Sequence, residues 1–425
     1  MGGIMPLNSF TIYYDNTRNK REIQEAAMVN RLQIPEGVSD FYGDTAYFKR
    51  KVEQSLRSSF LLRGYEEVET PSLEYFDTFK GEIGGIREEA TVRFFDMDGR
   101  MLALRPDLTM PVARIAATRP RGVGALRYCY IGNAYGMQQE YGMKRREFTQ
   151  AGCELLGVSG ISADAELLLT AAESLLNLGI QDFVLDLGHV GYLREVCRYG
   201  NLTAVQTAAV AALIDEKNEA ELAIYCREQG MDEGFAKQLC ELIYLFGDES
   251  VFQRARSLFP LKGCLAIVDE LEAICTMVRS MDLPFKISID FAMAPNLNYY
   301  TGLVFRGMSP LLGYSLVSGG RYDTLMEQFG RPMPAIGFAM GVGNILHVLR
   351  SMGALRACPK ADVLIGCGEG GSELLALAAK YRGEGKTVII SYAGDAAEFQ
   401  AEAAARKPKK AVYYTAGTIA YEEEF

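Results

Sequence analysis

Four polar side chains lie close together in a stretch whose composition is otherwise that of a β-strand. They are Glu147, Thr149, Gln150 and Glu154. Successive residues of a strand point to opposite faces of its sheet, so Gln150 and Glu154 share one face. An amide and a carboxylate on a concave floor can hold a small zwitterion. A solvent-facing sheet edge is the alternative, and this stretch alone does not separate the two.

A second polar group precedes a predicted helix. Arg105, Asp107 and Thr109 alternate with apolar residues at the end of a predicted strand, and a helix is expected over residues 111–118. Side chains at strand ends that lead into helices often hold ligands. The Asp107 carboxylate also suits an N-terminal helix cap, and from the residues alone the cap is favoured.

The polar stretch needs a scaffold, and the pattern predicts one. Two strands are expected over residues 127–134 and 147–156, joined by a loop. An amphipathic helix is predicted over 44–62, followed by a strand over 66–70. That strand meets Pro71, whose missing N–H favours a sheet edge or an interface.

Changes in pattern divide the chain into regions. The start is polar without steady periodicity, and a phrase opening at Met28 looks like a more natural beginning. A later region has helical periodicity punctuated by glycines, and the last alternates strand and helix patterns as in a small parallel sheet. The predicted boundaries are 1–30 for a poorly ordered extension, 31–190 with 284–350 for the main domain, 191–283 for a helical insertion and 356–425 for a small α/β domain.

Composition excludes several functional classes. The 425-residue chain is 23% charged with a net charge of −10, which argues against a broad nucleic-acid-binding surface. Nine cysteines without a CxxC pair and only two histidines exclude zinc-ribbon spacing and fit a reducing compartment. No apolar run approaches membrane-spanning length. We therefore expect a cytoplasmic protein with no cofactor, no metal site and no membrane contact.

A series of sequence blocks recurs in the order of one known family. The blocks are residues 37–41, 64–71, 104–109, 146–150, 298–302, 318–323 and 337–341. They resemble the catalytic domain of histidyl-tRNA synthetase. The resemblance implies an α+β fold of the class II aminoacyl-tRNA synthetase type, which is an antiparallel sheet flanked by helices. It also implies a dimer formed through the first helix and the strand that ends at Pro71. The small C-terminal domain loosely resembles a shortened anticodon-binding domain.

Three positions depart from the synthetase pattern. Synthetases of this type have arginines where this chain has Gly136, Pro295 and Asn344. Their guanidinium groups stabilise the negative charge that adenylation builds on the α-phosphate. Losing one such donor costs roughly 3 kcal/mol, or a factor of about 10²–10³ in rate. We therefore expect a chain without synthetase chemistry and without tRNA as a partner.

The amino-acid half of the site is retained. The resemblance maps the histidine contacts of the synthetases onto Asp107, which is Glu in those enzymes, and onto five unchanged residues. Carboxylates suit an α-ammonium and an imidazole N–H, and tyrosine hydroxyls can close around the ring. The expected histidine-binding residues are Asp107, Thr109, Gln150, Glu154, Tyr299 and Tyr300.

Part of the nucleotide half also persists. Lys144 and Phe148 match a phosphate-facing cation and an adenine-stacking aromatic in the synthetases. Residual nucleotide binding therefore stays open, although an aromatic residue in such a strand is more often ordinary core.

One known family combines these features, the regulatory subunits of ATP phosphoribosyltransferase. The resemblance implies a non-catalytic chain that senses L-histidine for feedback and supports a short-form catalytic subunit in the first step of histidine biosynthesis. A homodimer within a hetero-oligomer is expected. The alternatives are an active histidyl-tRNA synthetase and an amino-acid-binding synthetase paralogue with another task.

Overall fold

The computed structural model describes most of the chain in two compact units. Of the described residues, 32–42 and 48–354 belong to the first unit, and 43–47 and 355–425 belong to the second. The predicted extension, residues 1–30, lies outside the described residues. Within the described strands, the side chains of residues 138–140, 143 and 144 are also outside the description. The described residues are 32–80, 90–119, 124–140, 143–295, 299–356, 358–368, 372–415 and 418–425.

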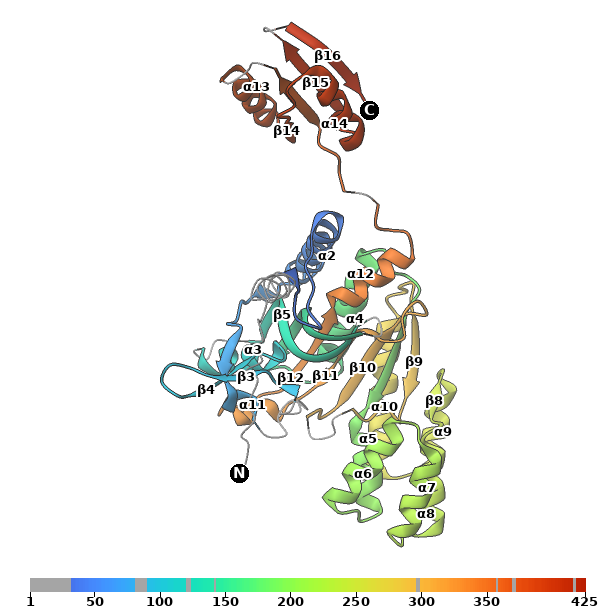
Figure 1. Cartoon of the computed structure of the whole chain (residues 1–425). Helices are drawn as coiled ribbons and strands as arrows, with labels where there is room; N and C mark the ends of the chain where they lie inside the picture. The colour runs from blue at the N-terminus through green and yellow to red at the C-terminus, as the bar shows by residue number, and fades with distance from the viewer. Residues whose placement is uncertain are drawn as a thin grey trace, which may run out of the picture. The chain divides into compact units, whose positions relative to one another are not determined.

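A large sheet organises the first unit (Figure 1). Its strand order is β1-β5-β6-β12-β11-β10-β7-β9-β8, and its pairs are antiparallel except for β1 with β5 and β7 with β9. Helices flank it, so the predicted class of fold is confirmed. The strands are β1 Glu66–Glu67, β5 Leu126–Glu140, β6 Met143–Leu156, β7 Val184–His189, β8 Phe246–Gly247, β9 Lys286–Asp290, β10 Leu303–Met308, β11 Ser315–Arg321 and β12 Ala335–Gly341.

Apolar residues make up most of the buried positions in the two long helices beside the sheet. In α2 (Gly43–Leu62) the buried residues Val52, Leu56 and Phe60 recur at every fourth position, as the amphipathic pattern predicts. In α4 (Ile161–Asn177) alanines and leucines supply the buried face. The remaining helices beside the sheet are α3 Thr109–Thr118, α11 Leu325–Gln328 and α12 Val342–Ser351.

Three of the predicted strand lengths are wrong. The strands β5 and β6 extend well beyond 127–134 and 147–156, because main-chain pairing continues through polar residues despite a bulge between Tyr135 and Gln138. The strand predicted over 66–70 is only β1. Beyond it, Arg105 Nη1 donates hydrogen bonds to the carbonyl and the hydroxyl of Thr70, the latter at 2.8 Å, so the Thr70 carbonyl bonds to a side chain.

Six helices lie between β7 and β9 in the chain. In Figure 1, α6–α9 form a group at the lower right of the view, away from the labelled strands β10–β12. Side-chain caps start three of these helices, for example the capping box of Thr203 and Gln206. The helix α10 packs against α4 and α5, which joins the group to the sheet. The helices are α5 Val190–Tyr199, α6 Ala204–Asp215, α7 Glu219–Glu228, α8 Glu233–Leu242, α9 Ser250–Leu258 and α10 Lys262–Arg279.

A separate three-stranded sheet lies earlier in the chain. It has the order β2-β4-β3, with β2 Leu73–Tyr75, β3 Arg93–Phe95 and β4 Met101–Leu104, and a short 3-10 helix, η1 (Phe76–Thr78), follows β2. Glu74 and Ala103 pair across it and are buried. The side chains of alternate parity therefore form its other face, which is exposed.

The second unit is a four-stranded sheet with the order β14-β13-β15-β16. Its three parallel strands and two helices match the predicted βαβαβ pattern. The antiparallel strand β16 was not predicted, because its last residues, Tyr421 to Glu424, lack apolar alternation. The elements are β13 Val363–Cys367, α13 Ser372–Gly383, β14 Val388–Ile390, α14 Ala396–Arg406, β15 Lys410–Thr415 and β16 Thr418–Glu424. Among the described residues no helix is long and apolar enough to cross a membrane.

Candidate functional site

Glu154 is the centre of a buried hydrogen-bond cluster. It lies near the end of β6 and is 1% exposed. Its Oε1 accepts hydrogen bonds from Thr109 Oγ1 at 2.9 Å and from the Tyr130 hydroxyl at 3.2 Å, and its Oε2 accepts one from the Tyr322 hydroxyl. Helix α3, strand β5 and the end of β11 therefore meet at one carboxyl group.

Burial disfavours the ionised form of the Glu154 carboxyl group. Desolvation raises the pKa of Glu154 to about 8, although the three hydroxyl donors lower it, and the charge of Asp107 raises it further. Burial likewise raises the pKa of Asp107 to about 6. A cationic or N–H-donating ligand placed between the two groups would stabilise both carboxylates.

Asp107 caps a helix and lies near the Glu154 cluster. Its Oδ1 accepts a hydrogen bond from the backbone N–H of Met110 at 3.3 Å, which is a capping contact at the start of α3. Its charge also acts on Glu154, Tyr299 and Tyr300, so it lies near the same cluster.

The two neighbouring tyrosines border this cluster. The Tyr299 ring stacks on Tyr322 with a centroid distance of 5.4 Å and meets the Tyr300 ring edge-on at 4.8 Å. Burial raises the pKa of Tyr300 to about 12 and that of Tyr299 well above its usual value. Both hydroxyls therefore stay protonated at neutral pH and can donate hydrogen bonds.

Glycines on the central strands leave room for these side chains. A Cβ atom on Gly337 would lie 1.6 Å from Glu154 Oε2, and one on Gly320 would lie 2.8 Å from the Tyr300 ring. A Cβ on Gly152 would lie 2.5 Å from the Tyr130 hydroxyl oxygen. Only residues without a side chain fit at these three positions while the cluster keeps its geometry.

Gly337→Ala is expected to destabilise the protein by about 1–3 kcal/mol, because the new methyl group displaces the Glu154 carboxylate. Urea denaturation measures the change. Gly313→Ala is the matched control, since a Cβ there meets nothing within 4 Å and the substitution should change stability by no more than about 0.5 kcal/mol. Equal stability of the two variants would contradict the close packing described here.

The remaining residues of the polar stretch divide between the two faces of β6. Gln150 is half-buried on the face of Glu154, and its Oε1 is buried without a hydrogen-bond partner among the described residues. On the other face, Asn133 donates to Glu147 at 2.7 Å and accepts from Thr149 at 2.8 Å. An unpaired buried acceptor at Gln150 suits a ligand N–H.

The residues predicted to contact a nucleotide and the three residues that replace synthetase arginines lie in different surroundings. Phe148 is 8% exposed and belongs to the core cluster, while the side chain of Lys144 lies outside the described residues. Asn344 is 4% exposed and its Nδ2 donates to the Ser315 carbonyl at 2.9 Å. Gly136 lies at the bulge of β5, and Pro295 is half-buried.

Sequence reasoning missed two members of the cluster, Tyr130 and Tyr322. Both are almost fully buried, and a buried tyrosine hydroxyl needs a hydrogen-bond partner. The need of a buried tyrosine hydroxyl for a hydrogen-bond partner could have indicated both residues. Which group is the partner depends on the strand register, which places Tyr130 opposite Gly152, two residues from Glu154.

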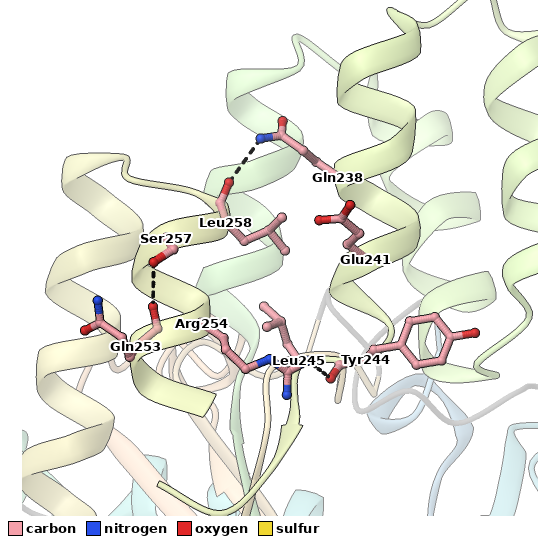
Figure 2. Close-up of a pocket in the computed structure, with 8 residues that line it drawn as sticks. All are labelled: Gln238, Glu241, Tyr244, Leu245, Gln253, Arg254, Ser257 and Leu258. Carbon is pink, nitrogen blue, oxygen red and sulfur yellow. Dashed lines mark hydrogen bonds between the residues drawn. The ribbon is translucent and has the colours of Figure 1, made fainter. Parts of the chain in front are cut away.

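A groove lies away from this cluster, between α8 and α9 (Figure 2). Its volume is 650 Å³, and no predicted site residue lines it. Three of its polar side chains donate hydrogen bonds to main-chain carbonyls: Gln238 to Leu258 at 3.1 Å, Arg254 to Tyr244 at 2.7 Å and Ser257 to Gln253 at 3.0 Å. In the described part of the chain, no group of three or more His, Cys, Asp or Glu residues could hold a metal ion.

Comparisons with known proteins identify the family of the chain. The family model of histidyl-tRNA synthetase matches residues 37–345. An ATP phosphoribosyltransferase regulatory subunit of Acetivibrio thermocellus is 35% identical over 79% of this chain and 80% of its own length. One of Thermoanaerobacter sp. (strain X514) is 37% identical over 75% of this chain and 83% of its own length.

A solved structure extends the likeness to almost the whole chain. It is described as an ATP phosphoribosyltransferase regulatory subunit/histidyl-tRNA synthetase from Bacillus halodurans, and it superposes with a TM-score of 0.79 at 27% identity, covering 91% of this chain and 99% of its own. The chain therefore belongs to the family of ATP phosphoribosyltransferase regulatory subunits, which share the fold of histidyl-tRNA synthetase.

Proposed function

We propose that this chain is the non-catalytic regulatory subunit of ATP phosphoribosyltransferase and that it senses L-histidine at the Glu154 cluster. In this role it supports a short-form catalytic subunit in the first step of histidine biosynthesis, in the cytoplasm. The single observation that carries the histidine site is the buried carboxyl group of Glu154, which accepts hydrogen bonds from three hydroxyl groups and lies near Asp107 and on the same strand face as the unpaired Gln150 oxygen.

The chemistry of histidine matches that set of groups. Its ammonium and its imidazole N–H need acceptors, and Asp107, Glu154 and the unpaired Gln150 oxygen supply them. The Tyr299 and Tyr300 rings supply flat apolar surface and hydroxyl donors. Thr109 holds the Glu154 carboxylate in place at 2.9 Å. Together these residues form a site for an amino acid with a second nitrogen-bearing group.

The proposal includes the loss of synthetase chemistry at Gly136, Pro295 and Asn344. None of these residues carries a cationic side chain, and the Asn344 amide is engaged with the Ser315 carbonyl. Adenylation without the three arginines would lack roughly 3 kcal/mol of transition-state stabilisation for each. The position of Phe148 in the core cluster favours a structural role over adenine stacking.

Association of two copies is the second part of the proposal. On the exposed face of the sheet β2-β4-β3, Leu73, Tyr75 and Phe94 are 39–49% exposed. A contiguous apolar surface of this kind on a sheet is typical of a protein–protein interface. It supports a homodimer within the hetero-oligomer, formed near the helix and strand that the resemblance implies.

Isothermal titration calorimetry of the full chain tests the histidine site. We expect L-histidine to bind, and Tyr300→Phe to weaken binding about 3–10-fold, because it removes one hydroxyl donor. Tyr199→Phe is the matched control, since Tyr199 is 57% exposed at the end of α5. Histidine-dependent exchange of pyrophosphate into ATP would contradict the proposal, because it would show working adenylation.

A further inference from the structure

We infer that Arg194 is a positioning residue, which holds Tyr300 in place and connects the helices α5–α10 with the amino-acid site. The inference rests on the proposed function, because it concerns how the histidine site is built and linked to the rest of the chain. Arg194 belongs to α5, the first helix after β7, and was not among the residues predicted for the site.

The contact to Tyr300 is direct. Arg194 Nη2 donates a hydrogen bond to the Tyr300 carbonyl at 2.6 Å, and its side chain is half-buried. Two residues further on, the Gly302 carbonyl accepts from the backbone N–H of Val190 at 3.1 Å. The first turns of α5 therefore fix the main chain on both sides of Thr301. A charge-assisted bond in a partly buried position is among the stronger hydrogen bonds in a protein.

Fixing this main chain also orients the Tyr300 ring. The ring packs against the buried cluster of Val190, Met293 and Val304, and it lies over Gly320. The hydrogen bond to the Tyr300 carbonyl fixes the position of the main chain, and the apolar contacts fix the orientation of the Tyr300 ring. The Tyr300 hydroxyl can serve a ligand beside Glu154 only when both conditions hold.

The opposite side of α5 contacts α9. Tyr192 is fully buried, and its hydroxyl donates to the Ala255 carbonyl at 2.7 Å. Two residues along a helix correspond to about 200° of rotation, so Tyr192 and Arg194 point to opposite sides of α5. Arg254, the neighbour of Ala255, lines the groove shown in Figure 2. A continuous series of contacts thus runs from the groove side of α9 through α5 to Tyr300.

This arrangement has a thermodynamic consequence. A ligand that uses Tyr300 stabilises the contacts of Arg194 and so the position of α5. A partner that shifts α5 through its contact with α9 must then change the affinity for the ligand. By linkage, the ligand changes the affinity for that partner by the same factor. The coupling requires that α5 has two positions with different Tyr300 contacts, and this can be measured.

Calorimetry on the full chain with L-histidine is the first test. Arg194→Met is expected to weaken binding at least about 10-fold, in line with the loss of a hydrogen bond to a charged group. Arg194→Lys, which keeps a cationic donor, should restore most of the affinity. Arg256→Met is the control. Its guanidinium pairs with Asp269 and Glu272 at 2.7 and 2.6 Å, which joins α9 to α10 and not α5 to Tyr300.

Hydrogen exchange supplies a second test, whose result would not change if Arg194 had a purely structural role. In the wild-type chain, saturating L-histidine should slow amide hydrogen exchange in the sheet, in α5 and around Ala255. In Arg194→Met, L-histidine should still slow exchange in the sheet but no longer in α5 and α9. Protection confined to the sheet in the wild type would overturn the inference, even if Arg194→Met failed to fold.

The outcomes separate the inference from the proposed function. If the wild type binds L-histidine and Arg194→Met binds it equally well, the positioning role is wrong while the histidine site stands. If the wild type shows no binding of L-histidine, the proposed histidine site fails, and the inference fails with it.

Discussion

Glu154→Gln should abolish measurable L-histidine binding and at the same time make the ligand-free protein more stable at pH 8. The carboxyl group has a pKa of about 8 in the folded chain, against a usual value of 4.5. The folded state therefore holds this proton more tightly than the unfolded state. The stability from Glu154 is fully present below about pH 4.5 and is lost as the pH rises through about 8. Glutamine does not ionise, so it avoids this loss.

Thermal denaturation at pH 5 and pH 8, together with calorimetry, checks this prediction. The wild type should lose more stability than Glu154→Gln between the two pH values, by a few kcal/mol. Glu147→Gln is the matched control on the same strand, because Glu147 accepts from Asn133 on the opposite face of β6. If Glu154→Gln binds L-histidine like the wild type, Glu154 is not a ligand-binding residue.

Arg321→Met is expected to reduce the free energy of unfolding by about 3–5 kcal/mol, the second large effect. The side chain of Arg321 is 8% exposed, and its partner Asp164 is 1% exposed. Arg321 Nε donates to Asp164 at 3.1 Å, and Nη1 lies 3.1 Å from Asp323. Removing the guanidinium leaves a buried carboxylate without its cation. The loss should also loosen the neighbouring Tyr322, whose hydroxyl bonds to Glu154.

Urea denaturation measures this effect, and a double-mutant cycle isolates its cause. Arg321→Met combined with Asp164→Asn should be more stable than the sum of the two single changes implies, because no charge is then left unpaired. Arg119→Met is the control, since its pair with Glu66 is exposed and is worth about 1 kcal/mol or less. Strictly additive effects would show that the Arg321–Asp164 pair does not stabilise the fold.

Periodicity predicted the helices well and the strand ends poorly. The helices α6 to α10 could be located because their apolar residues recur at helical spacing over nine or more residues. The predicted strand continued to Thr70, whose carbonyl instead accepts a hydrogen bond from Arg105, 35 residues further along the chain. A contact at that sequence distance leaves no trace in the local pattern of residues 66–70.

The residues of the site, like the elements of the fold, could be predicted only in part. Resemblance and strand parity together indicated Gln150 and Glu154, and both lie on one face of β6. The three hydroxyl donors to Glu154 come from α3, β5 and the end of β11, so Tyr130 and Tyr322 could be assigned only once the register was known. Gly337 gives the same lesson, because its need for a bare Cα follows from a side chain on the neighbouring strand.

The order of strands in the large sheet has a consequence for synthesis on the ribosome. Strand β6 pairs with β12, which follows it by about 180 residues. At translation rates of 5–20 residues per second, the open edge of β6 waits roughly 10–40 s for its partner. During that interval the nascent chain presents an unpaired strand, which invites pairing with other chains. Slow translation or delayed chaperone release should therefore lower the yield of this chain more than that of a protein whose strands pair with their nearest neighbours.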